Sequence, residues 1–128
     1  MPNDVRNFVL DKGYDCSAAV VKYMAVKMTG DQTVGPVTAV GDVVIGITQE
    51  SVTAGEITKG KGAPVATQGI SAFVAGATPC VAGNKLALGV LANGTLVPLG
   101  TGSAGTDVIG VCVLGAAAGG RGAVRLMI

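Results

Sequence analysis

The chain has 128 residues, of which nearly half are hydrophobic, 21 are glycine and none is histidine; its formal net charge is +1. This length fits one domain, and so small a charge gives no electrostatic case for nucleic acid binding. Few charges and a positive mean hydropathy predict a surface that self-association or a docking partner covers.

Residues 1–15 are predicted to form an extended N-terminal arm, and residues 16–128 a single β domain. The arm mixes polar and apolar residues without a regular period and is too short to build a core element. Two interpretations stay open: a frayed terminus, or an arm that orders when it lies on a partner. In the second case the contact residues are Val5, Arg6, Phe8, Val9, Leu10 and Tyr14.

The rest of the chain reads as short strands separated by Gly, Pro, Asn and Asp. Strands are expected at about 22–28, 33–40, 43–49, 64–68, 70–74, 86–91 and 95–99, and in a closing hairpin of 108–114 with 123–128. Asn93-Gly94 is the strongest hairpin signal, because this pair tolerates the positive φ angles of a type I′ turn. Gly55 is expected to turn the chain toward Ile57, and helix signals are nearly absent. The pattern predicts an all-β fold, a small Gly-rich β-barrel or sandwich.

The segment 107–128 is similar in sequence to the earlier segment 42–56. In register, Ile45-Gly46-Ile47 falls on Ile109-Gly110-Val111, and Ala54-Gly55 falls on Ala118-Gly119. We interpret this internal similarity as pseudo-symmetry of one barrel. Gly110 is expected to be needed for strand curvature.

Histidine, a common catalytic residue type, is missing from the chain. Without histidine, the usual acid–base and Ser-His-Asp routes are closed, so no enzyme, catalytic residue, cofactor or metal site is predicted. Asp42 and Asp107 could form an acid pair or a metal site, but turn residues that accept backbone N–H bonds are favoured. The cysteines at 16, 80 and 112 are expected to be buried free thiols.

No targeting signal is expected from the sequence. The N-terminal residues carry charges where a signal peptide would have its apolar region. The sequence has no uninterrupted run of 18 apolar residues, so no membrane span is expected.

An ordered series of motifs resembles the capsid cement (head decoration) proteins of tailed bacteriophages. It starts at Lys22-Tyr23 with Val26-Lys27-Met28, continues through 43–49, 54–56, 69–71, 81–86 and Asn93-Gly94, and ends at 108–111 with Gly119 and 124–126. Each motif is a common strand–turn piece, and the series covers roughly residues 22–128.

The resemblance implies a structural protein on the outer surface of the virion capsid, assembled in the host cytoplasm. It implies binding to the major capsid protein of an expanded head, as a homotrimer that bridges and stabilises neighbouring subunits. The arm of residues 1–15 resembles the N-terminal extensions that some such proteins lay along the capsid. The alternative is a virion-surface or tail-associated β domain that binds a host glycan or protein, although the few aromatic residues argue against glycan binding.

Overall fold

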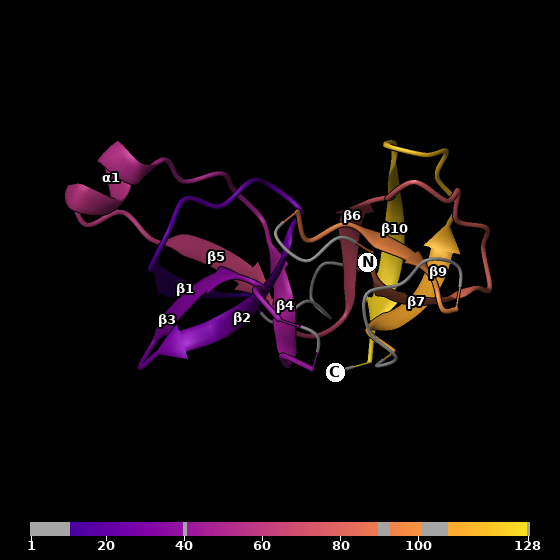
Figure 1. Cartoon of the computed structure of the whole chain (residues 1–128), viewed down its shortest axis with the longest axis horizontal. Helices are drawn as coiled ribbons and strands as arrows, with labels where there is room; N and C mark the ends of the chain where they lie inside the picture. Colours follow the sequence, from indigo (N-terminus) through magenta and orange to yellow (C-terminus); the bar gives the residue numbers. More distant parts are fainter. Residues whose placement is uncertain (1–10, 40, 90–92, 101–107, 128) are drawn as a thin grey trace, which may run out of the picture.

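A computed structural model describes residues 11–39, 41–89, 93–100 and 108–127 (Figure 1). Two five-stranded units follow each other along the chain. The first contains β1 (Asp11–Cys16), β2 (Ala25–Gly30), β3 (Thr33–Pro36), β4 (Val44–Thr48) and β5 (Ala63–Ala66). The second contains β6 (Ile70–Val74), β7 (Lys85–Leu88), β8 (Leu96–Pro98), β9 (Gly110–Leu114) and β10 (Arg121–Leu126). The predicted all-β class is confirmed.

The first unit is a closed barrel with the strand order β1-β3-β2-β4-β5. Four of its pairings are antiparallel, and the β1–β3 pairing that completes the ring is parallel. Residues 11–15, expected in the arm, therefore pair inside this barrel: Asp11 lies opposite Ala66, and Asp15 opposite Thr33. Residues 1–10 of the expected arm lie outside the described residues.

The second unit repeats the pairings of the first. Its strand order is β6-β10-β9-β7-β8, and an isolated parallel bridge from Ala75 to Leu96 stands where β1 pairs with β3. The bridge between Val20 and Val52 likewise has a counterpart between Cys80 and Ala116. The similar segments 42–56 and 107–128 thus contain β4 and β9, which lie in two different units. This corrects our interpretation of pseudo-symmetry within one barrel.

The repeat extends to backbone conformation. Tyr23 and Gly83 both have positive φ, 65° and 95°, in equivalent turns. The N–H of Tyr23 donates to the Thr48 carbonyl, and the N–H of Gly83 donates to the Cys112 carbonyl. A positive φ is easy for glycine but strained for a tyrosine. The first turn therefore holds Tyr23 in a backbone conformation that tyrosine disfavours.

Two apolar cores stabilise the molecule. One, within the first barrel, contains Val26, Val34 and Val65. The larger one runs across both units, because Ile47 of β4 packs in the same cluster as Phe73 of β6 and Leu86 of β7. Burial of apolar surface contributes about 25 cal/mol per Å², so this shared core holds the two units together.

The described strands confirm the predicted hairpins. β7 pairs with β8 so that Leu86 lies opposite Pro98, as expected around Asn93-Gly94. β9 pairs with β10 as the predicted closing hairpin, with Val124 opposite Cys112. The strand predicted at 70–74 is β6.

The turn expected at Gly55 is wrong: residues 54–58 form the short helix α1 (Ala54–Thr58). Thr53 Oγ1 accepts from the N–H of Glu56, and Glu56 Oε1 accepts from the N–H of Thr53. This reciprocal capping box satisfies N–H groups that a helix start leaves unpaired. α1 stands at the outer end of the first barrel (Figure 1). No helix among the described residues is long and apolar enough to cross a membrane.

Candidate partner-binding site

Five of the six predicted contact residues lie outside the described residues: Val5, Arg6, Phe8, Val9 and Leu10. The sixth, Tyr14, lies in β1, where it is half-buried and packs against the core of the first barrel. Its backbone pairs with Ala63 of β5. The ring of Tyr14 therefore takes part in barrel packing.

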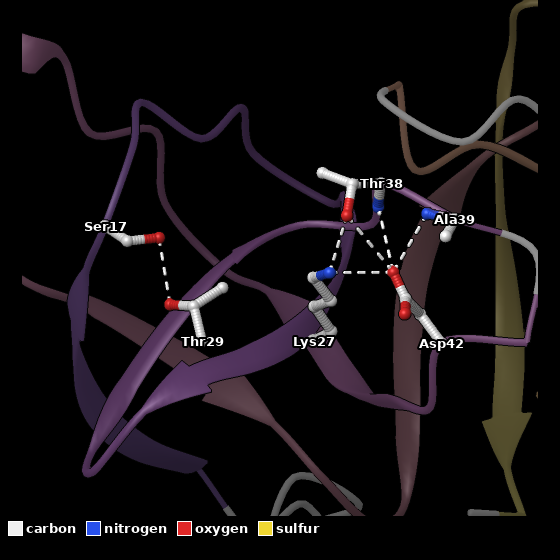
Figure 2. A network of polar contacts seen from close by, with 6 residues as sticks. All are labelled: Ser17, Lys27, Thr29, Thr38, Ala39 and Asp42. Atoms are coloured by element: carbon white, nitrogen blue, oxygen red, sulfur yellow. Dashed lines mark hydrogen bonds and ion pairs between the residues drawn. The ribbon is translucent and has the colours of Figure 1, made fainter.

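Asp42 is a turn residue, as favoured from the sequence (Figure 2). Its Oδ2 accepts hydrogen bonds from the N–H of Thr38 at 3.1 Å and of Ala39 at 2.9 Å, and pairs with Lys27 Nζ at 2.7 Å. The hydrogen bond from Lys27 is the largest cause that lowers the pKa of Asp42 from 3.8 to about 2, with further lowering from the two N–H groups. This carboxylate ties β2 to the loop before β4. Asp107 lies outside the described residues.

A second polar contact in the same region links side chains of the first barrel (Figure 2). Thr29 Oγ1 donates to Ser17 Oγ at 2.9 Å, which joins β2 to the segment after β1. Such bonds hold the loops of the barrel and point to no reacting group.

The cysteines are buried free thiols, as expected. Desolvation is the largest cause that raises the pKa of Cys16, Cys80 and Cys112. A raised pKa lowers the thiolate fraction and with it the reactivity. Within the ranges that the structure describes, no three His, Cys, Asp or Glu side chains are grouped to hold a metal ion.

Residues of the two units line a half-open pocket of about 290 Å³ where the units meet. Its walls come from the positive-φ turn of the first barrel and from β6 and the β7–β8 turn of the second unit. The lining residues are Val21, Lys22, Tyr23, Met24, Val74, Asn93 and Thr95. We call this the junction pocket.

Backbone contacts fix the turn against the second unit. The N–H of Ala25 donates to the Gly94 carbonyl at 3.0 Å. In the first barrel the corresponding carbonyl, that of Gln32, accepts at 2.8 Å from Asp15 within the β1–β3 seam. The Gly94 carbonyl thus accepts a hydrogen bond from the other unit, whereas the Gln32 carbonyl accepts one from its own barrel. Glycine is required here because a Cβ on Gly94 would lie 2.7 Å from the Ala25 nitrogen.

Two cations flank the aromatic ring of the pocket. Lys22 Nζ and Arg121 Cζ each lie 5.0 Å from the centre of the Tyr23 ring. Arg121 starts β10 and lies opposite Val74 of β6. Cation–π attraction of this kind contributes about 0.5–1 kcal/mol at exposed sites, so the ring helps to gather positive charge at the pocket.

One residue of the pocket lining, Thr95, has an unsatisfied hydroxyl that is itself buried. The buried Thr95 Oγ1 has no hydrogen-bond partner in the described structure. Its counterpart in the first barrel, Thr33 Oγ1, donates to the Asp31 carbonyl at 2.9 Å. A buried polar group without a partner costs about 1–3 kcal/mol.

Our sequence reasoning did not find this pocket. From the sequence, Lys22 and Tyr23 are recognised only as the start of the motif series. The equivalence of Thr33 with Thr95 and of Tyr23 with Gly83 follows from the strand pairings and backbone bonds of the two units.

Comparison with known proteins bears on the fold. No family model matches the chain, and no curated protein matches it. Among solved structures, it is similar to the head fiber N base of bacteriophage phi29, with a TM-score of 0.56 and 20% identity. The match covers 93% of this chain and 94% of that one. At this identity the likeness shows a shared fold, and it covers both repeated units.

Proposed function

We propose that this chain is a structural protein of a phage head, which binds the outer surface of the expanded capsid and stabilises the major capsid subunits. The observation that carries the proposal is the fold match along nearly the whole of both chains with a base domain whose name places it on a phage head. The ordered motif series from Lys22 to 126, which resembles capsid cement proteins, supports the same role independently of the structure.

The internal duplication suits a bridging role. A protein made of two similar units offers two similar surfaces, held at a fixed spacing by the core that Ile47, Phe73 and Leu86 share. Such a protein contacts two neighbouring subunits at once and favours their assembled state by mass action.

We further propose a homotrimer on the capsid. Exposed aliphatic side chains supply a surface for self-association: Val81 is 64% exposed, Leu114 is 62% exposed and Val113 is 44% exposed. Val81 lies close to Gly115, the residue after Leu114, so these side chains belong to one region of the second unit. Light scattering coupled to size exclusion tests this, with a mass of three times the 12.5 kDa chain expected.

Co-sedimentation tests the capsid role. Purified protein is mixed with expanded heads of the phage that encodes it, and with unexpanded procapsids as a control. We expect saturable binding to expanded heads. Absence of binding to both particles, together with specific hits on a glycan array, would replace the proposal with host-surface recognition.

Deletion of residues 1–10 tests the proposed capsid-binding arm. Because β1 begins at Asp11, this deletion leaves every described strand pairing in place. We expect an unchanged melting temperature and weaker binding to heads. A deletion of residues 1–16 is the contrasting variant, since it removes β1 and should unfold the first barrel. Undiminished head affinity of the shorter deletion would remove the arm from the proposal.

A further inference from the structure

A row of side chains crosses the outer face of the second unit. Lys85 of β7 lies opposite Val111 of β9. Val111 lies opposite Arg125 of β10, which lies opposite Ile70 of β6. Residues that lie opposite each other in neighbouring strands place their side chains on the same face of the sheet. Lys85, Arg125 and Ile70 are exposed and Val111 is half-buried. We call these residues the outer row.

The first barrel has a corresponding row that is buried. Ala25 of β2 lies opposite Ile47 of β4, which lies opposite Ala66 of β5. Ile47 aligns with Val111 in the two similar segments, so this row matches the outer row strand by strand. All three residues are buried in the core that the two units share. The second unit therefore covers a face of the first barrel whose counterpart on the second unit is open.

The open face is basic. Lys85 and Arg125 stand where the buried row has alanines, and the described part of the second unit contains no Asp or Glu. The ion pairs between described residues all lie in the first unit, so neither cation of the outer row has a carboxylate partner among them. A partner that covers this face therefore has to bring negative charge.

Apolar side chains accompany the cations. Val111 lies between them, and Val113, which is 44% exposed, follows two residues later in β9. Val113 is one of the residues assigned above to self-association, so the outer row is continuous with that region. An apolar centre with charged residues around it is the usual anatomy of an interface between proteins. A protein surface that carries carboxylates fits both parts of the face.

The far end of the same chain carries such carboxylates. Asp31 precedes Gln32 in the turn between β2 and β3, and the Gln32 carbonyl accepts from the N–H of Asp15 at 2.8 Å. Asp15 and Asp31 are both exposed. This turn lies at the end of the first barrel away from the second unit (Figure 1). One copy therefore presents acidic groups at one end and the basic outer row on the other unit.

The chain itself contains a contact of the required kind. The β7–β8 turn is the counterpart of the β2–β3 turn, since Gly94 and Gln32 have similar positive φ angles of 62° and 55°. The Gly94 carbonyl accepts from the N–H of Ala25 in the buried row. Because Ala25 corresponds to Lys85, the β2–β3 turn of a second copy would meet the outer row in the same way.

We propose that the β2–β3 turn of one copy docks on the outer row of a second copy. Asp15 and Asp31 of one copy pair with Lys85 and Arg125 of the other, and the turn covers the aliphatic residues between these cations. A contact between two different surfaces forms a ring when the rotation closes and an open fibre when it does not. That three copies close a ring rests on the proposed homotrimer; the contact between copies does not.

Charge reversal tests the pairing, with self-association measured by sedimentation velocity over a range of concentrations. Arg125→Glu and Asp31→Lys should each raise the dissociation constant at least about tenfold, because like charges then face each other. The double variant, which restores an opposite pair, should recover the association of the wild type. Failure of this recovery would overturn the proposal.

Lys59→Glu is the matched control. It makes the same change in net charge as Arg125→Glu, at an exposed residue of the first barrel outside both docking surfaces. It should leave self-association unchanged. An equal loss of association in Lys59→Glu and Arg125→Glu would reduce the effect to net charge and overturn the assigned contact. Unchanged melting temperatures confirm that each variant is folded.

The oligomeric state separates this inference from the proposed function. A homotrimer that both reversals leave intact agrees with the proposed function and overturns the docking of the turn. Open fibres that both reversals abolish support the docking and overturn the homotrimer. A wild-type chain that stays monomeric at every concentration overturns both.

Discussion

Replacement of Gly110 by alanine should destabilise the protein strongly. Gly110 lies in β9 between two neighbours, opposite Leu126 of β10 and Leu86 of β7. A Cβ there would overlap the Arg125 carbonyl oxygen and lie 2.7 Å from Val124 Cγ2. The sequence suggested strand curvature as the reason for this glycine, and the structure adds close backbone approach as the stronger one.

The size of the effect follows from that geometry. Overpacking of a core costs about 1–3 kcal/mol, and Gly110 should be near the upper end because the obstructing atom belongs to the backbone of a paired strand. A loss of about 3 kcal/mol would take a large part of the 5–15 kcal/mol typical of domains. In a protein of this size it lowers the melting temperature by about 10 °C.

Thermal unfolding followed by circular dichroism, with urea unfolding at 25 °C, measures this change. Gly13→Ala is the matched control, because Gly13 also lies in a strand, β1, and a Cβ there would meet nothing within 4 Å. It should change stability by less than about 0.5 kcal/mol. If Gly110→Ala melts within about 2 °C of the wild type, the packing argument is refuted.

Three further predictions follow from the polar contacts and the thiols. Asp42→Asn should lower the melting temperature at pH 7; because folding lowers the pKa of Asp42 from 3.8 to about 2, its contribution is present above pH 3.8 and is lost as pH falls toward 2, where variant and wild type should converge. Thr53→Ala should cost about 1 kcal/mol of helix stability and speed amide hydrogen exchange in α1 only, and exchange changes in the barrel strands would contradict a purely local cap. Cys16, Cys80 and Cys112 should resist a thiol reagent at neutral pH until denaturant is added, and rapid labelling of the native protein would contradict their burial.

Turn chemistry accounts for what the sequence predicted well. Asn93-Gly94 and the closing hairpin were found because a hairpin's register depends on residues close together in the chain. Local chemistry also contained a signal that was passed over: Thr53 and Glu56 have the spacing of a capping box. Gly55 between them was interpreted as a chain reversal, although a capped helix tolerates one glycine at a cost of about 1 kcal/mol.

The junction pocket could not be predicted in the same way. Its residues come from positions 21–24, 74, 93 and 95, and tertiary structure brings them together. The positive φ of Tyr23 is not encoded by its type, since tyrosine disfavours that conformation. It follows from the tertiary contacts of the turn, including the bond that Tyr23 donates to the Thr48 carbonyl.

The two repeats differ in a few contacts, one of which joins one unit to the other. Many backbone pairings of the two repeats correspond, as in the bridges Val20–Val52 and Cys80–Ala116. The match fails at Gly94, whose carbonyl accepts from the N–H of Ala25 in the first barrel, and at Thr95, whose hydroxyl lacks the acceptor that its counterpart Thr33 has. The bond from Ala25 to Gly94 therefore adds a backbone contact between the units to the apolar core that they share.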